Sequence, residues 1–221
     1  MKFLLNGLEN PFPLDKSTPL GPALQTLQEK HLLDTDVITA ISVDGQPLTS
    51  ELLAQWQNRP LDQFHEINLE TQKRHQYAAV GLRLIAHKLQ AASPTRQQIA
   101  DHLSQGHSPE AMPLLTDYLQ TWSTVQLTLA SACRLMNLLW DSVPNNNSDS
   151  QPSASATPEL MVRQAVKQLS EKLQELQSAL AAADLVLLAD LLNYDFANLA
   201  HSWLQMLTQL ADQFDPPTAS P

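Results

Sequence analysis

The chain has 221 residues and a formal net charge of −10, and 43% of its residues are hydrophobic. This length and composition fit a globular protein with one sizeable core or two smaller ones. The acidic balance argues against nucleic acid and anionic membrane surfaces as partners, because both attract clusters of Lys and Arg.

No segment of the sequence suggests export or membrane insertion. The first apolar run stops at Asn6, which is too short for the core of a signal peptide. The Leu- and Ala-rich stretch 179–192 is interrupted by two aspartates, so it does not read as a membrane span. Cys133 is the only cysteine, which makes an internal disulfide impossible. We therefore expect a cytoplasmic protein.

Residues 1–70 alternate short apolar runs with turn signals. Strands are predicted at 2–6, 37–43 and 65–69, because these runs are apolar, β-branched or alternating. A helix begins after Ser17, Thr18 and Pro19, which read as a cap followed by Pro in the first turn. This order of elements predicts a small mixed α/β domain.

The central hairpin and the elements after it carry a resemblance. Residues 41–48 contain a strand that ends at Asp-Gly and continues into a second short strand, followed by a helical turn at 50–56 and a strand at 67–69. This arrangement resembles the β-grasp, or ubiquitin-like, fold. Modifiers of that family end in a free Gly-Gly tail, whereas here the last strand leads into a helix at Thr71. The resemblance therefore implies a compact interaction module and not conjugation or sulfur-carrier chemistry.

The next segment, 71–142, has the apolar spacing of a helical hairpin. Its first helix is predicted to kink at Pro94 and to end at Gly106, and its second begins at Ser108. Apolar residues of the second helix recur by steps of three and four, with one polar interruption at Gln126, which indicates a heptad seam. The seam residues are Met112, Leu115, Leu119, Trp122, Gln126, Leu129, Cys133, Met136 and Trp140.

A second hairpin is predicted at 158–214, after a flexible linker at 143–157. Its first helix has a seam of its own, and a turn near Asp184 leads into the last helix; the tail, 215–221, is predicted to be disordered. The seam consists of Val162, Val166, Leu169, Leu173, Leu176 and Leu180. The whole chain is thus predicted to be α+β and mainly α, with a small β-grasp-like domain followed by two long helical hairpins in a four-helix, bundle-like arrangement.

Motifs that carry known chemistry are missing from the sequence. The five glycines are scattered, so there is no phosphate-binding loop. No Glu-x-x-His pair of the kind that builds di-metal bundles occurs in the helices, and the pair Asp62 and His65 lies among the strands. Cys133 falls on the seam, where a small core residue fits, and His102 and His107 flank a helix end. No catalytic, cofactor-binding or metal-binding residue is predicted, and no cofactor.

An acidic cluster in the last hairpin is the candidate site. Asp184 fits the N-cap of a helix, and Asp190 and Tyr194 are four residues apart and share a face. We interpret Asp190, Tyr194 and Asp195 as an acidic strip with an aromatic anchor that binds a partner. The alternative is a solvated edge beside the core.

The function expected from these features is a non-enzymatic protein–protein interaction module, such as an adaptor, regulator or chaperone-like protein. The helical part is similar in kind to acidic helical export or secretion chaperones of bacteria. Its expected partner is a protein with a basic or amphipathic segment. Two alternatives are a metal-dependent helical hydrolase that uses Asp184, Asp190 and Asp195, and a structural subunit that forms a homodimer through a heptad seam.

Overall fold

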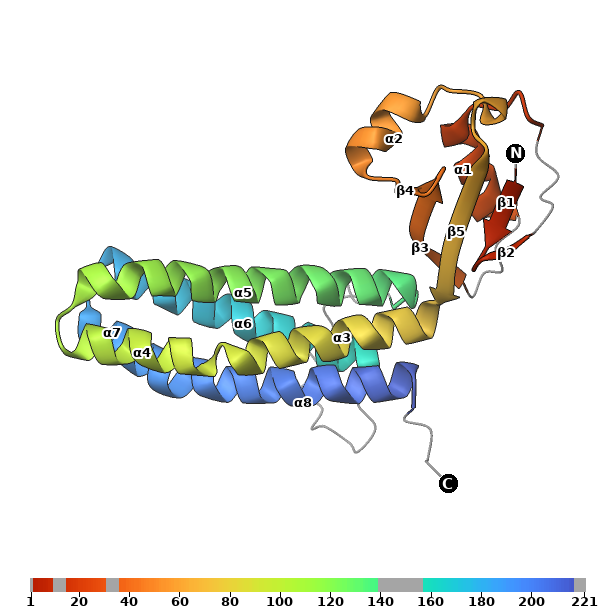
Figure 1. Ribbon diagram of the computed structural model, residues 1–221. Helices are drawn as coiled ribbons and strands as arrows, with labels where there is room; N and C mark the ends of the chain where they lie inside the picture. The colour runs from red at the N-terminus through yellow and green to blue at the C-terminus, as the bar shows by residue number, and fades with distance from the viewer. Residues whose placement is uncertain (1, 10–14, 31–35, 139–156, 217–221) are drawn as a thin grey trace. The chain divides into compact units, whose positions relative to one another are not determined.

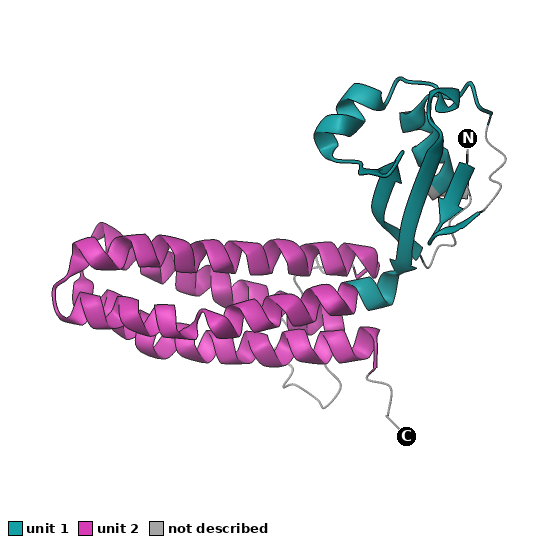
Figure 2. Ribbon diagram, viewed as in Figure 1, with its two compact units in different colours: residues 1–77 teal, residues 78–221 magenta. Residues whose placement is uncertain are grey.

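The computed structural model describes residues 2–9, 15–30, 36–138 and 157–216, and the chain divides into two compact units, 1–77 and 78–221 (Figures 1 and 2). Each unit has its own hydrophobic core. The predicted α+β, mainly α class is confirmed. The predicted linker and the predicted tail lie almost wholly outside the described residues.

The first unit is built on a five-stranded mixed sheet. Its order is β2-β1-β5-β3-β4; β1 pairs in parallel with β5, and the other pairs are antiparallel. Such a sheet is compatible with a β-grasp-like fold. The strands are β1 (Lys2–Leu5), β2 (Leu8–Glu9), β3 (Asp36–Val43), β4 (Gln46–Pro47) and β5 (Glu66–Lys73).

Helical segments and one tight turn complete this unit. They are α1 (Leu20–Lys30), α2 (Ser50–Trp56) and the 3₁₀ turn η1 (Leu61–Gln63). The hairpin between β3 and β4 turns at Asp44 and Gly45, which both have positive φ, as a two-residue type I′ turn requires. Asp44 Oδ1 also accepts hydrogen bonds from the backbone N–H groups of His65 and Glu66, both at 2.8 Å. This aspartate therefore fixes the turn against the start of β5.

The last strand is longer than the sequence predicts. It continues past Leu69 to Lys73, and the helix α3 (Arg74–Ala91) begins at Arg74 and not at Thr71. The extension pairs with the start of β3, where Lys73 Nζ lies 2.8 Å from the carboxylate of Asp36. Pairing with a neighbouring strand thus overrides the local preference of this segment for helix.

The second unit consists of long helices. After α3 come α4 (Ser93–Ser104), α5 (Ser108–Leu135), α6 (Pro158–Ala181), α7 (Leu185–Asp190), the π-helical segment η2 (Leu191–Asp195) and α8 (Phe196–Phe214). In Figure 1, α3 and α4 run end to end, and α5 returns beside them. A single turn residue, Ala92, separates α3 from α4 just before Pro94, which cannot continue the hydrogen bonding of a helix. On its other flank α4 packs against α7 and η2, and α6 packs against α7 and α8.

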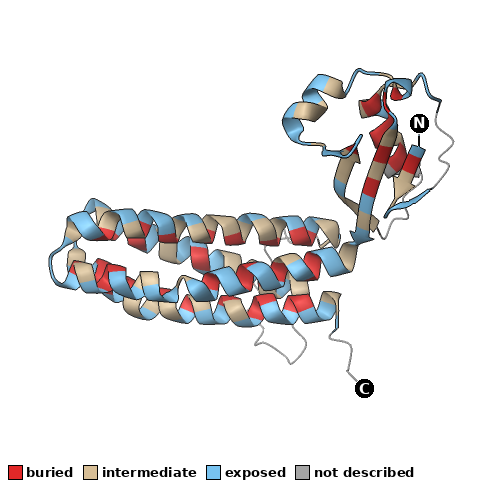
Figure 3. Ribbon diagram, in the orientation of Figure 1, coloured by how far each residue is buried: buried red, intermediate tan, exposed pale blue. Residues whose placement is uncertain are grey.

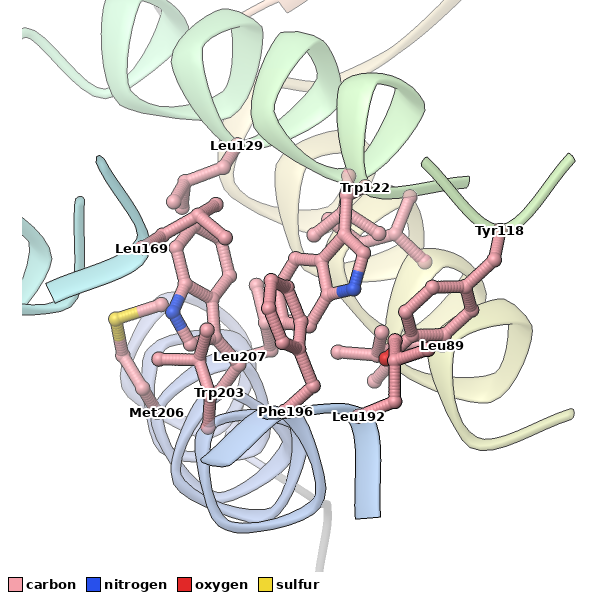
Figure 4. Close-up of a cluster of buried hydrophobic side chains, with 14 of the residues drawn as sticks. Leu89, Tyr118, Trp122, Leu129, Leu169, Leu192, Phe196, Trp203, Met206 and Leu207 are labelled. Carbon is pink, nitrogen blue, oxygen red and sulfur yellow. The ribbon is translucent and has the colours of Figure 1, made fainter. Parts of the chain in front are cut away.

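The centre of the helical unit is aromatic. Figure 3 shows buried positions recurring along the helices, and Figure 4 shows side chains from α3, α5, α6 and α8 meeting in one cluster. Trp122 and Trp203 pack edge to face with ring centroids 5.4 Å apart, and Phe196 lies 6.3 Å from Trp122. Tyr118 packs against Trp122 and Phe196 at 6.4 and 6.2 Å. These contacts join α5 to α8 directly.

The buried seam of α5 is rotated from the predicted one. Leu115, Trp122, Leu129 and Cys133 are buried as predicted, but Gln126 is only half-buried. The other predicted members, Met112, Leu119 and Met136, are also half-buried, and Trp140 lies outside the described residues. Their places in the core are taken by residues on the flank of the predicted seam: Ala111, Tyr118, Val125 and Ala132. The polar interruption therefore lies at the edge of the core.

The seam of α6 is narrower than predicted. Val162, Leu169 and Leu176 are buried, and these residues are seven apart. The alternate members, Val166, Leu173 and Leu180, are half-buried and pack at the margin of the core. One side of α6 therefore holds the helix in the unit, while its other residues face outward.

Candidate functional site

A groove runs along the outer side of α6 where α7 and η2 pack against it. It has a volume of about 480 Å³. Leu187 and Leu191 form its apolar part, and the exposed carboxylates of Glu171 and Glu175 form its acidic part. Gln174 and Ser178 complete the lining. We call this the α6–α7 groove.

The turn before α7 brings the two sides of the groove together. The N–H of Asp184 donates to the carbonyl of Ala179 at 3.0 Å, and that of Ala183 donates to Leu180 at 3.1 Å, which is the pattern of a Schellman motif. Ala183 has φ +53°, a conformation that usually calls for glycine. The carboxylate of Asp184 then accepts from the N–H of Leu187 at 2.9 Å, so Asp184 is the N-cap of α7.

Helical hydrogen bonding widens from Leu191 to Asp195. Leu188, Leu192 and Phe196 follow one another by steps of four residues, and all three are buried. In a π turn a step of four residues turns less far around the helix axis, which keeps these side chains on the side that faces the core. The guanidinium of Arg96 on α4 donates to the carbonyl oxygens of Leu192 at 2.6 Å and Asn193 at 3.3 Å. Arg96 thus satisfies backbone acceptors in this irregular segment.

The three residues predicted to bind a partner lie at this segment, but they do not form a single strip. Asp190 is exposed at the end of α7, and the side chain of Tyr194 in η2 is 67% exposed. Asp195 is half-buried and turns toward α6, where its carboxylate lies 3.0 Å from Lys172 Nζ. Asp190 and Tyr194 are therefore exposed side chains within three residues of Leu191, which lines the groove, whereas Asp195 is part of an ion-pair network.

That network involves residues which the sequence analysis did not single out. Lys172 Nζ lies 2.8 Å from Glu175 Oε2 as well as 3.0 Å from Asp195 Oδ1. The carboxylates of Glu175 and Asp195 raise the pKa of the Lys172 ammonium above its usual range. Earlier in α6, Lys167 Nζ lies 3.9 Å from the carboxylate of Glu171. The signal for this cluster was a lysine at the flank of the α6 seam, three residues after Leu169, and it is informative only once η2 is known to pack beside it.

Several large apolar side chains remain exposed next to the groove. Val186 is 72% exposed and Leu187 is 45% exposed, and both belong to the short helix α7. Together with Tyr194 they are three exposed apolar side chains of α7 and η2, and Leu187 is the one that lines the groove. We call the groove and these three side chains, with Asp190, the α6–α7 surface.

The structure also shows the surroundings of the cysteine and histidines that the sequence analysis considered. Cys133 is buried, and burial, with Glu159 nearby, raises the pKa of its thiol to about 11, so it is a poor nucleophile. The rings of His102 and His107 lie 6.2 Å apart across the end of α4. His65 has an almost fully exposed side chain 3.9 Å from Asp44. Within the described part of the chain, no three His, Cys, Asp or Glu side chains gather in a way that could hold a metal ion.

Two further hollows lie in the helical unit. A groove of about 850 Å³ between α3 and α8 is lined mainly by polar side chains, and Arg83 at one end is bound to Asp212 at 3.1 Å. A hollow of about 300 Å³ between α5 and α6 contains Leu127, Val162 and Val166. Neither combines charged groups with exposed apolar side chains as the α6–α7 surface does. No helix in the described ranges is long and apolar enough to cross a membrane.

Comparison with protein families divides the chain in a similar way. Residues 82–206 match a domain of unknown function, DUF8042, and this match covers more than half of the chain. The chain belongs to the DUF8042 family. Residues 1–73 match the TP0873 N-terminal domain, and this match ends with β5 at Lys73. No curated protein and no solved structure matches the chain. The DUF8042 match includes every residue of the α6–α7 surface.

Proposed function

We propose that this protein is a non-enzymatic interaction module and that its α6–α7 surface binds a basic, amphipathic segment of another protein. The observation that carries the proposal is a groove in which Leu187 and Leu191 lie beside the carboxylates of Glu171 and Glu175. A helix with one apolar and one basic face can bury leucines in such a groove and direct its cations at the rim.

The local charge supports a basic partner. Two carboxylates line the groove, and three more lie at the N-cap of α7, at its end and in η2. The cations bonded in this region are Lys167, Lys172 and Arg96. The carboxylates are Glu171, Glu175, Asp184, Asp190 and Asp195. An excess of negative charge on a protein of net charge −10 attracts cationic segments and speeds their association.

The exposed apolar side chains support a docking role as well. Val186, Leu187 and Tyr194 lie in a short part of the chain and are each at least 45% exposed. Exposed apolar side chains that cluster next to polar groups are typical of interaction sites, and tyrosine is frequent among the residues that dominate binding energy. Tyr194 is therefore the proposed anchor.

The proposal extends to the rest of the chain. We propose that the N-terminal unit is a β-grasp domain that serves as a second interaction module, on the strand order β2-β1-β5-β3-β4 with β1 parallel to β5. A cytoplasmic location is also part of the proposal, since a chain with one cysteine has no internal disulfide to form.

The test uses the full chain and a synthetic amphipathic peptide with leucines at helical spacing and arginines on its other face. Binding is measured by surface plasmon resonance in low and high salt. Changing both Asp190→Asn and Asp195→Asn should slow association, and Tyr194→Ala should speed dissociation, because charge steers the encounter and an aromatic anchor holds the complex. High salt should remove most of the effect of charge, since the Debye length falls from about 10 Å at 0.1 M to about 3 Å at 1 M.

A matched control removes the same charge elsewhere. Glu110 and Asp117 are exposed on α5, and Glu110→Gln with Asp117→Asn lowers the negative charge by the same amount. If this control weakens binding as much as the double change at Asp190 and Asp195, the attraction is only to the overall charge. If Tyr194→Ala also leaves dissociation unchanged, the α6–α7 surface is not the binding site.

A further inference from the structure

The sheet of the first unit has an edge that is paired over only part of its length. β3 pairs with β5 along its length, but on its other side β4 pairs only with Ser42 and Val43 (Figure 1). The N–H of Leu48 then donates to the carbonyl of Ile41 at 2.8 Å. Among the residues that the structure describes, 36–40 therefore have a strand neighbour on one side only, and their outward main-chain groups are open to a further strand.

The open stretch lacks the side chains that usually protect an edge strand. Residues 37–43 contain no charge, proline or glycine, and most of them are β-branched. The strands at the opposite edge of the sheet differ, because Lys2 in β1 and Glu9 in β2 are exposed charges. An uncharged, β-branched edge with open main-chain groups is a template for another strand, and charged side chains or proline would otherwise prevent such pairing.

We infer that the open edge of β3 pairs with β3 of a second copy of this chain, antiparallel and across a two-fold axis. Two identical strands can pair in this way because residues 37–43 place no like charges opposite each other, and β-branched side chains form favourable cross-strand pairs. A contact in which both copies use the same surface closes at two molecules. The inference rests on the part of the proposed function that makes the N-terminal unit an interaction module, and it names a second copy as the partner of that unit.

A bulge limits the length of edge that can pair. The register between β3 and β5 shifts between Ile38 and Ala40, and the hydroxyl of Thr39 donates to the carbonyl of Glu70 at 3.2 Å. A bulge bends its strand and adds twist, which shortens the stretch that a further strand can follow. The dimer is therefore reversible, with an interface smaller than that of a permanent complex.

Salt distinguishes this contact from the binding proposed for the α6–α7 surface. Two molecules of net charge −10 repel each other, and no charge within residues 37–43 offsets this repulsion. Salt screens the repulsion, so it should tighten the dimer. The same change in salt should weaken the binding of a basic peptide at the α6–α7 surface.

The experiment measures the mass of the full chain by sedimentation equilibrium over a range of concentrations. The mass should rise from 24.5 kDa toward twice that value. Ala40→Lys should weaken the dimer about tenfold or more, because Ala40 is exposed at the open edge and the dimer contains the substitution twice. Ala40→Val keeps the edge uncharged and should leave the dimer intact. Glu70→Gln is the matched control: it changes the net charge by the same amount on β5, opposite Ala40 and away from the edge, and should alter the affinity by less than about twofold.

Amide hydrogen exchange of the unaltered protein gives a second readout that needs no variant. Exchange in residues 36–41 should be slower at high than at low concentration, since pairing takes N–H groups of this stretch out of water. Protection that does not depend on concentration would mean that another part of the same chain covers the edge, and it would overturn the inference. A mass of one chain at every concentration, or equal effects of Ala40→Lys and Glu70→Gln, would overturn it too. None of these measurements involves the peptide that tests the α6–α7 surface, so the two proposals can fail separately.

Discussion

The aromatic core of the helical unit and the α6–α7 surface each contain a tyrosine, which is buried in the core and exposed at the surface. Tyr118 is 2% exposed and packs edge to face against Trp122 and Phe196, whereas Tyr194 is 67% exposed only two residues before Phe196. The first ring stabilises the fold by leaving water. The second contributes little to the fold, and it is the anchor that we propose for a partner. Substitutions should separate these roles, because those in the core change stability and those at the surface do not.

The largest effect is expected for Trp203, at the centre of the aromatic core. Its side chain is fully buried, and its ring centroid lies 5.4 Å from that of Trp122. Trp203→Ala should lower the free energy of unfolding by about 3–5 kcal/mol, through lost burial and the cavity left behind. Denaturant unfolding followed by far-ultraviolet circular dichroism measures this change, since most of the helix is in the second unit.

A conservative substitution at the same position serves as the control. The indole N–H of Trp203 has no hydrogen-bond partner among the described residues, so Trp203→Phe removes volume without breaking a hydrogen bond. Trp203→Phe should lower the free energy of unfolding clearly less than Trp203→Ala does. A loss below about 1 kcal/mol for Trp203→Ala would show that this cluster is not the core of the unit, and the contrast with the α6–α7 surface would fail.

The second prediction concerns Arg96, which links the core to the surface. Its guanidinium donates to backbone carbonyls of Leu192 and Asn193 at the π-helical segment. Arg96→Met removes these charged donors from a partly buried place, so we expect a loss of about 1.5–3 kcal/mol in unfolding free energy. Amide hydrogen exchange should rise most at residues 191–195. Uniform exchange across the unit would contradict a local role for this arginine.

Much of this organisation follows from local patterns in the sequence. The Asp-Gly turn at 44–45, the N-cap at Asp184 and the helix ends near Gly106 depend on neighbouring residues alone, and these are features the sequence can reveal. The α+β, mainly α class follows from the same periodicities. The domain boundaries remain predictions, although the structure divides the chain at Tyr77.

The features that were missed depend on which helices pack together. The seam of α5 was placed one residue away, on Gln126, because its apolar stripe is broad and only the neighbouring helices decide which side is buried. The π-helical segment was not predicted, because leucines eight residues apart, such as Leu191 and Leu199, also fit the apolar stripe of an ordinary α-helix. The role of Lys172 depends on Asp195, which is distant in sequence and so not predictable from spacing.

The third prediction is a gain in stability at the turn that closes the groove. Ala183 follows the C-cap of α6 and has φ +53°, where a side chain is strained and glycine is not. Ala183→Gly should raise the free energy of unfolding by about 0.5–1 kcal/mol, since relief of strain outweighs the added freedom of the unfolded chain. Ala182→Gly, one residue earlier in a right-handed helical conformation, is the matched control and should be destabilising. Equal signs for the two variants would contradict the geometry of this turn.

The smallest effect on stability is expected where the effect on binding is largest. Tyr194→Ala removes a ring that is 67% exposed, and Asp190→Asn changes an exposed carboxylate, so each should alter the free energy of unfolding by less than about 0.5 kcal/mol. Tyr118→Ala, the same substitution in the core, should instead cost about 3–5 kcal/mol, the range for a buried aromatic side chain. Chemical unfolding of the three variants under one condition makes the comparison direct. If Tyr194→Ala cost more than about 1 kcal/mol, the ring would be part of the packing of η2, and its exposure would no longer argue for a partner.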